Sequence, residues 1–309
     1  MASVEEKLAA LRQEIDTVDH QLHDLLMRRC ELAVKVGEVK AERQPVGNNA
    51  AEGAKFIRPA REALILRRLV GRHTGKLPKA VIVRLWRELI SALLQVEGPF
   101  AVAVFSPDNE PGFWDIARDH YGSRVAVTSY DRVGLVLGAV QDGNATVGVV
   151  PLPREDDSDP WWRYLIAAGA PHIMGRLPFG DGGNQRGNRV EALVIGRAMN
   201  EPTGRDRSLL VVEPSREISR SALRGALTKA GLVPTFFAAW HSPHLGADLH
   251  LVEVEGFFAP GPLAIKDTEG NDTALVALGR GQLEGAHLTI IGSYAVPFTG
   301  QELGVPQRG

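Results

Sequence analysis

Apolar residues spaced alternately four and three positions apart run through the first forty residues of the chain. This heptad pattern places the apolar side chains on one face of an α-helix. At ~1.5 Å per residue such a helix is more than about 50 Å long. A small domain cannot cover a face of that length, so we expect a partner chain or other helices along it. The apolar positions are Val4, Leu8, Leu11, Ile15, Val18, Leu22, Leu25, Leu32, Val36 and Val39.

Two further helices are expected before residue 99. Residues 44–53 (QPVGNNAAEG) break the heptad with Pro, Gly and Asn, which is typical of a loop. A second helix is expected after Pro59, and a third from about Pro78, because Pro favours the first turn of a helix. Gly98 and Pro99 end the third. Three helices without an intervening strand predict an all-α unit over residues 1–98.

Beyond residue 99 the pattern changes to short apolar runs that alternate with helical segments. FAVAVF (100–105) and ATVGVV (145–150) are typical of buried strands, and a weaker strand lies between them at 125–128. This βαβαβ rhythm predicts a parallel sheet with crossover helices. A further strand is expected at 192–195. We assign residues 99–200 to an α/β lobe.

The last hundred residues predict a strand, a helix, two strands, a helix and a final strand. This βαββαβ order is typical of a ferredoxin-like sandwich, although a fold alone does not give a function. The expected elements span residues 208–212, 220–230, 234–239, 250–255, 273–278 and 288–291. We assign this unit to residues 205–300, so the predicted fold class is multidomain: an all-α unit followed by two α/β units.

Composition excludes several classes of protein. The formal net charge of −2 does not favour a nucleic-acid-binding surface or a polybasic membrane patch. Cys30 is the only cysteine, so no intrachain disulfide forms, which fits a reducing compartment. The first residues lack the apolar core of a signal peptide, and no run approaches the ~18 apolar residues of a membrane span. We expect a cytoplasmic protein.

Arg29 occupies a heptad position at which the neighbouring members of the series are apolar. A guanidinium in a helix seam is costly unless an anion meets it. Alternatively, the side chain reaches the edge of the bundle or pairs with a carboxylate. Lys40 lies eleven residues further on, roughly 16 Å along the axis and on nearly the same face, so the two side chains could converge on a small dianion.

Arg12 lies beside the same seam but seventeen residues from Arg29, roughly 25 Å away in one helix. It could join that site only from a partner helix that runs antiparallel. Arg61 and Glu62 begin the second helix, where Glu62 either points into the bundle or stays exposed near the helix N-terminus. Glu97 ends the third helix at the edge of its apolar stripe and, taken alone, is typical of a surface residue.

Three segments together resemble the all-helical chorismate mutases over residues 5–97. They are LRQEIDTVDHQLHDLLMRRCELAVKVGEVK, RPAREALILRRL and LWRELISALLQVE. The resemblance implies an intertwined homodimer with two sites and chorismate as the substrate. It implies that Arg29 and Arg12 of the partner subunit bind the two substrate carboxylates. It also implies Lys40 on one carboxylate and the ether oxygen, and the Arg61–Glu62 pair in the site with Glu62 on the ring hydroxyl.

The implied reaction is the concerted rearrangement of chorismate to prephenate, which needs no metal, cofactor or nucleophile. The protein must hold the compact conformer and stabilise the charge that develops on the ether oxygen. The family usually has a Gln as second donor to that oxygen, and Glu97 falls at this place here. A carboxyl donates a hydrogen bond only when protonated, which burial beside a ligand anion would favour. Gln95 is the alternative donor in a shifted register, about 200° around the helix.

The rest of the chain resembles a degenerate prephenate dehydratase with a C-terminal ACT-like domain. ATVGVVPLPRED is similar to the end of the family's first lobe, but Pro153-Arg154-Glu155 replaces the expected Glu-Asn-Ser. Val190-Glu191-Ala192 replaces its Thr-Arg-Phe, so the catalytic hydroxyl is missing and we expect no dehydratase activity. The closing IGSYAVPF stretch resembles ACT domains that bind phenylalanine, which leaves an aromatic amino-acid effector open.

Three functions therefore remain at this stage. The first is a chorismate mutase whose C-terminal half is structural or regulatory. The second is a bifunctional chorismate mutase/prephenate dehydratase. The third is a non-catalytic helical dimer that tethers an amino-acid sensor and binds a regulatory anion with its Arg and Lys residues.

Overall fold

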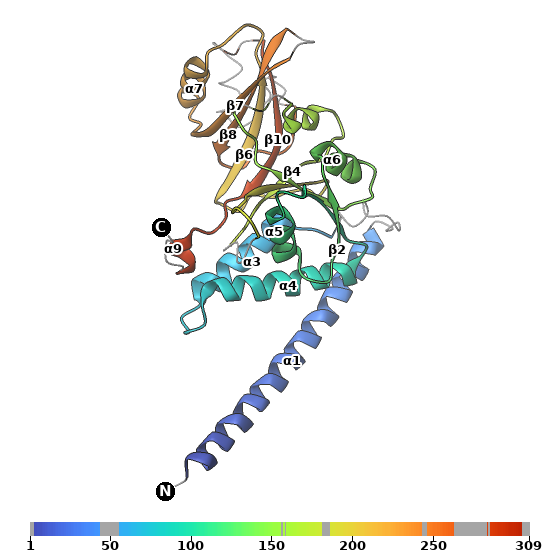
Figure 1. Ribbon diagram of the computed structural model, residues 1–309, viewed down its shortest axis with the longest axis vertical. Helices are drawn as coiled ribbons and strands as arrows, with labels where there is room; N and C mark the ends of the chain where they lie inside the picture. Colours follow the sequence, from blue (N-terminus) through green and yellow to red (C-terminus); the bar gives the residue numbers. More distant parts are fainter. Residues whose placement is uncertain are drawn as a thin grey trace.

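The computed structural model describes residues 3–43, 56–155, 157, 159–180, 186–242, 246–262, 283 and 285–304. Helices gather at one end of the molecule, and a mixed β-sheet with its own covering helices forms the rest (Figure 1). The expected loop at 44–53 lies outside the described residues, as does the helix expected at 273–278.

The first helix, α1 (Val4–Arg43), projects away from the body of the chain (Figure 1). The heptad thus correctly predicted a long helix over these residues. Every side chain from residue 3 to residue 28 is exposed, and burial begins at Arg29. The apolar face is therefore uncovered in the single chain: Val4 is 68% exposed and Leu25 is 66% exposed. Within the described residues, the C-terminal part of α1 packs on α4.

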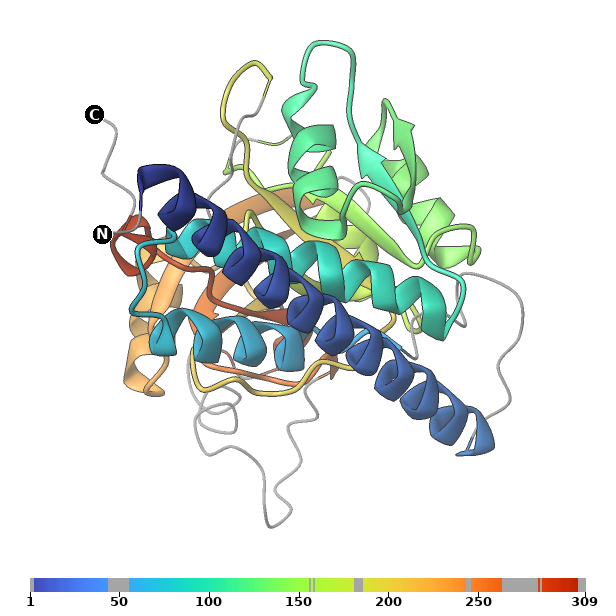
Figure 2. The same cartoon turned by 90° about the horizontal axis from the view of Figure 1, so that it is seen from below.

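The other two helices, α3 (Pro59–Arg72) and α4 (Lys79–Glu97), lie side by side (Figure 2). Pro at the first position starts α3, and Gly98 ends α4 by donating its backbone N–H to the Leu94 carbonyl. Both helices bury one stripe against the sheet region and its helix α5. The buried apolar members are Ala60, Ala63, Leu66, Val70, Val83, Ile90, Leu93 and Leu94.

The predicted βαβαβ unit is present. Strands β1 (Ala101–Phe105), β2 (Ala126–Tyr130) and β3 (Val147–Pro151) pair in parallel with β1 in the centre. Two crossover helices join them, α5 (Gly112–Tyr121) and α6 (Val133–Gln141). They contribute to different core clusters, because α5 packs with α4 while α6 packs with the turn η1 (Trp161–Ile166).

The sheet continues through two antiparallel strands. The sequence predicted the later of the two in the chain and missed the earlier one. β5 (Ala192–Gly196) pairs with β3, and β4 (His172–Leu177) pairs with β5. The turn η1 was also not predicted. Both missed segments lack a regular apolar period, since η1 is a short aromatic turn and the middle of β4 contains Gly and Arg.

The C-terminal strands are longer than expected and form an antiparallel group in the order β10-β6-β8-β7. Helix α7 (Arg220–Lys229) covers one face through Leu223 and Leu227. A two-residue strand, β9, pairs with β10, and a short helix, α9, follows β10 in the chain. The bounds are β6 (Asp206–Glu213), β7 (Pro234–Ser242), β8 (Ala247–Glu255), β9 (Gly261–Pro262), β10 (His287–Ala295) and α9 (Gly300–Leu303).

The strand groups on either side of residue 200 belong to one ten-stranded sheet, because β10 pairs in parallel with β4. The pairing rests on Gly292, which opposes Ile173. Gly292 has a φ of 145°, and a Cβ there would collide with the Ile173 backbone. No helix within the described ranges is long and apolar enough to cross a membrane.

We predict that Gly292→Ala separates the two halves of the sheet. The substitution combines a backbone conformation that L-residues rarely adopt with a direct clash, so it should cost at least about 2 kcal/mol of unfolding free energy. Urea unfolding measures the change. Gly225→Ala in α7 is the control, because nothing lies within 4 Å of its added Cβ and the helix should gain up to about 1 kcal/mol. Equal stability of the two variants would contradict this role for Gly292.

Candidate functional site

Three of the predicted site residues gather where the end of α1 meets α3 and α4. Arg29 of α1 is half-buried, and the charges that act on its guanidinium are those of Glu97 on α4 and Arg61 on α3. Burial lowers the pKa of Arg29; Glu97 opposes this effect and Arg61 adds to it. A Cβ at Gly37 would lie 3.8 Å from the Cα of Glu97, so α1 and α4 are in contact at this point.

The structure does not bring Arg12 to this cluster, and it does not describe the side chain of Lys40. Arg12 is exposed on the projecting half of α1, about 25 Å along the helix from Arg29. Lys40 lies in the last turn of α1, and its side chain falls outside the described residues. Both assignments therefore remain predictions.

Glu62 points inward from α3 rather than into solvent, and it forms an ion pair with Arg87 of α4. The Oε2 atom of Glu62 accepts hydrogen bonds from both terminal nitrogens of Arg87, at 2.8 and 2.9 Å. The exposed fractions of these side chains are 12% for Glu62 and 6% for Arg87. In a pair this deeply buried, each partner needs the other, because loss of either one leaves an uncompensated charge.

A third side chain reaches the pair from the α/β region. The Nε2 atom of His120, at the end of α5, lies 2.9 Å from a terminal guanidinium nitrogen of Arg87. The Arg87 nitrogen can only donate, so His120 must accept with a neutral Nε2 and carry its proton on Nδ1. Burial, and then the charge of Arg87, lowers the pKa of His120 well below its ordinary value, which agrees with a neutral ring.

Desolvation dominates the electrostatics of Glu62. Burial raises the pKa of its carboxyl, Arg87 and a hydrogen bond from the Arg58 backbone pull it down, and the charge of Glu97 raises it further. The neighbouring Tyr121 has a raised pKa for the same first reason, burial, with a smaller contribution from Glu62. Arg87 is therefore the main group that opposes this rise in the pKa of Glu62.

The sequence reasoning missed Arg87 and His120. Arg87 lies between Val83 and Ile90 in the buried stripe of α4, so a charged residue interrupts an apolar series there. The same signal singled out Arg29 and could have identified Arg87. His120 gives no such signal, because its partner lies 33 residues away in another helix.

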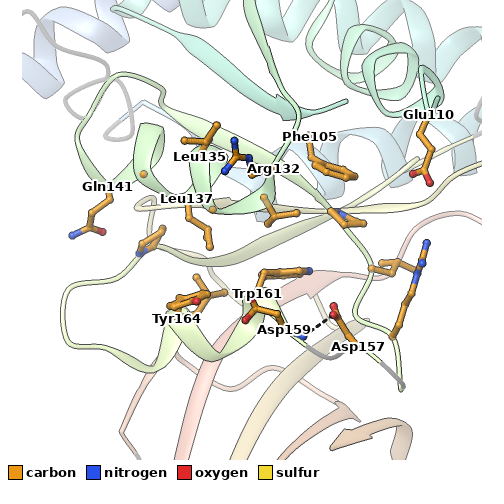
Figure 3. Close-up of a pocket in the computed structure, with 18 residues that line it drawn as sticks. Phe105, Glu110, Arg132, Leu135, Leu137, Gln141, Asp157, Asp159, Trp161 and Tyr164 are labelled. Atoms are coloured by element: carbon orange, nitrogen blue, oxygen red, sulfur yellow. Dashed lines mark hydrogen bonds between the residues drawn. The ribbon is translucent and has the colours of Figure 1, made fainter. Parts of the chain in front are cut away.

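A separate cavity of about 940 Å³ lies where β1 and β3 end (Figure 3). Its lining includes Phe105 at the end of β1, Pro151 at the end of β3, the start of α6, and Trp161 and Tyr164 of η1. Parallel strands commonly bind ligands beyond their carboxyl ends. Among the residues that the structure describes, none of the predicted site residues lines this cavity.

Comparison with known families identifies the helical part of the chain. Residues 11–98 match the family model described as "Chorismate mutase type II". They form a chorismate mutase type II domain. The predicted all-α unit and its family are thereby confirmed for the N-terminal part of the chain.

Curated relatives of the chain are bifunctional enzymes. The bifunctional chorismate mutase/prephenate dehydratase of Stutzerimonas stutzeri is 33% identical over 152 residues, which cover 49% of this chain and 40% of that protein. The enzyme of the same description from Pseudomonas aeruginosa is 33% identical over 154 residues, 50% of this chain and 40% of that protein. The matched part of the chain thus spans 40% of the length of these relatives.

Solved structures similar to the chain include a prephenate dehydratase from Streptococcus mutans. It has a TM-score of 0.45 and 16% identity, and the match covers 64% of this chain and 98% of that one. A prephenate dehydratase from Arthrobacter aurescens in complex with L-Phe has a TM-score of 0.43 and 12% identity, with 64% and 92% covered. Likeness at this level carries no conclusion about activity.

The neutral His120 predicts a loss of stability in acid. The unfolded chain takes up a proton near the ordinary histidine pKa of 6.5, whereas the folded chain does not until a much lower pH. Stability should therefore fall as the pH drops below about 6.5, by up to about 1.4 kcal/mol per pH unit from this group.

His120→Gln removes this titration and keeps an acceptor near the Nε2 position. We expect the free energy of unfolding to change less between pH 7 and pH 5 in the variant than in the wild type, as measured by urea unfolding. The same dependence on pH in both proteins would show that folding does not lower the pKa of His120.

Proposed function

We propose that the chain is a chorismate mutase that works as an antiparallel dimer through α1. The observation that carries this proposal is the uncovered apolar face of α1, which has the half-buried Arg29 near one end and the exposed Arg12 near the other. Two such helices laid antiparallel bring Arg12 of the partner subunit to Arg29, and bury both apolar faces.

Further apolar surface on the same helical unit supports this association. Leu85 of α4 is 54% exposed, and Val81 and Val96 of α4 and Leu64 of α3 are exposed as well. Exposed apolar side chains are typical of interaction sites when they form a continuous patch, and we propose that these four belong to the dimer contact. A second copy of α1 supplies a partner whose apolar face is equally long, as an isologous two-fold interface requires.

The proposed site gives each charged residue a task in one pericyclic step. Arg29 and the partner subunit's Arg12 bind the two carboxylates of chorismate, because guanidinium groups match carboxylates with two parallel hydrogen bonds. Lys40 contacts one carboxylate and the ether oxygen, where negative charge develops as the C–O bond breaks. Arg61 adds positive charge beside Arg29, and Glu62 accepts the hydrogen bond of the ring hydroxyl.

Glu97 is proposed as the second donor to the ether oxygen. Its place at the end of α4, within the electrostatic reach of Arg29, supports this assignment. It must be protonated to donate, and a bound dianion beside it favours the protonated form.

Mixing two inactive variants tests whether Arg12 acts across the dimer. Arg12→Ala and Arg29→Ala should each lower kcat/KM for chorismate by at least about 100-fold, because each removes a carboxylate contact. A mixed dimer regains one intact site, since one subunit keeps Arg29 and the other keeps Arg12. Equimolar mixing after reversible unfolding should restore about a quarter of the wild-type activity.

The control is Arg12→Ala refolded with itself, which should stay inactive. No recovery in the mixture, with dimers formed, would place Arg12 outside the partner's site. A wild-type protein that binds chorismate without turnover would instead favour the non-catalytic dimer that tethers a sensor.

The dependence on pH tests Glu97. Activity should fall as the pH rises, because deprotonation of Glu97 removes a donor and adds a negative charge beside the developing oxyanion. Glu97→Gln keeps a donor at every pH and should flatten the alkaline fall in kcat. An unchanged alkaline limb in this variant removes Glu97 from the site, and Gln95→Ala then tests the alternative donor.

For residues 205–300 we propose an ACT-like regulatory domain. The antiparallel order β10-β6-β8-β7, with α7 packed on one face, supports this assignment. The proposed effector is an aromatic amino acid, and calorimetry with phenylalanine and tyrosine tests it. For residues 99–200 we propose a truncated dehydratase-like lobe without dehydratase activity. Release of phenylpyruvate from prephenate would support the bifunctional enzyme instead.

A further inference from the structure

The ion pair of Glu62 lies at the junction of the helical domain and the α/β region. Glu62 comes from α3, Arg87 from α4 and His120 from α5, so three elements meet at one carboxylate. A small cavity of about 40 Å³ adjoins them, with Arg176 of β4 on its far side. Glu62 therefore depends on side chains of both regions.

We propose that Arg87, itself held by His120, is a positioning residue that keeps the Glu62 carboxylate charged and aligned for the substrate's ring hydroxyl. This inference rests on the proposed mutase function. It adds two residues that do not touch the substrate, one of which belongs to the α/β region.

The geometry of the three side chains supports this role. Both hydrogen bonds from Arg87 converge on Oε2, which fixes the plane of the Glu62 carboxylate. His120 accepts from one of the two donating nitrogens of Arg87 and so limits rotation of the guanidinium. The His120 ring is fixed in turn by an edge contact with Tyr121, at 4.7 Å between ring centroids.

The charges around Glu62 explain why it needs Arg87. Glu97 on α4 is a like charge, Tyr121 and His120 on α5 are neutral, and Arg176 on β4 pairs with Glu191 and Glu253. Arg87 is thus the cation that Glu62 contacts directly within the described part of the chain. A hydroxyl donates well to a carboxylate, so loss of the charge on Glu62 weakens substrate binding.

Arg87→Met removes the cation and keeps much of the side-chain volume. We expect the acid limb of the kcat/KM profile to move upward by at least about one pH unit, because Glu62 then takes up its proton more readily. KM for chorismate should rise by about tenfold and kcat should change less, since the hydroxyl contact serves ground state and transition state alike. Arg87→Lys should recover part of both effects.

The matched control is Arg84→Met. Arg84 also joins α4 to α5, through a 2.5 Å ion pair with Asp119, but it lies on the exposed side of α4. This variant should keep the wild-type pH profile. His120→Leu should reproduce a smaller version of the Arg87→Met shift, whereas His120→Gln, which retains an acceptor, should not.

A titration without substrate separates this inference from the proposed function. The ¹³C carboxyl signal of Glu62 is assigned by its loss in Glu62→Gln, and it should titrate at higher pH in Arg87→Met than in the wild type. Equal titration in the two folded proteins, or an unmoved acid limb, overturns the role of Arg87. Absence of chorismate turnover by the wild type refutes the proposed function, while the titration still tests the pair. If Arg87→Met does not fold, the two His120 variants carry the same comparison.

Discussion

The apolar face of α1 is the constraint on which the rest of the account depends. A helix of forty residues, about 60 Å long, carries a continuous apolar stripe, and the chain covers only its last few turns. Exposure of such a surface to water is costly, and the described part of the chain leaves most of the stripe uncovered, so we infer that a second chain buries it. A second α1 satisfies this requirement and, if antiparallel, also completes the cationic site. In the proposed dimer, one contact therefore buries the apolar face and completes the site.

The second constraint is the cost of burying charge. At the α1 end of the helical domain, Arg29 stays half-buried beside Glu97 and Arg61, a group with a net positive charge that can accept an anion. Glu62 of α3 is paired with Arg87, which His120 contacts in turn. The Arg29 cluster therefore carries uncompensated positive charge, whereas Arg87 balances the charge of Glu62. In the proposed site, this pair links the α/β region to a residue that binds the substrate.

Local patterns in the sequence were sufficient for the elements whose period is regular. The heptad predicted α1, the prolines at 59 and 78 predicted the starts of α3 and α4, and apolar runs predicted β1 and β3. The sequence did not predict β4, because neighbours from distant parts of the chain determine its burial. For the same reason it did not predict the pairing of β4 with β10 at Gly292. Long-range pairing leaves little trace in a single sequence.

The same limit applies to the site. Arg29 was recognisable as a charge within an apolar series, and the family resemblance assigned the residues around it. Arg87 carried a comparable signal in α4, but its meaning depends on Glu62, 25 residues earlier, and on His120 in another region. In the proposed dimer, Arg12 acts in the site of the partner subunit, so a single chain cannot show its place beside Arg29.

A distance measurement between two copies of α1 tests the central claim most directly. In a protein with Cys30 replaced by Ser, a spin label at His20 lies near the centre of the proposed antiparallel pair, and one at Glu5 lies near its ends. Pairing of position 12 with position 29 predicts about 10–20 Å between labels at position 20 and about 45 Å between labels at position 5. Short distances at both positions would indicate parallel helices, and no dipolar coupling at either would indicate a monomer. Both results would contradict the account.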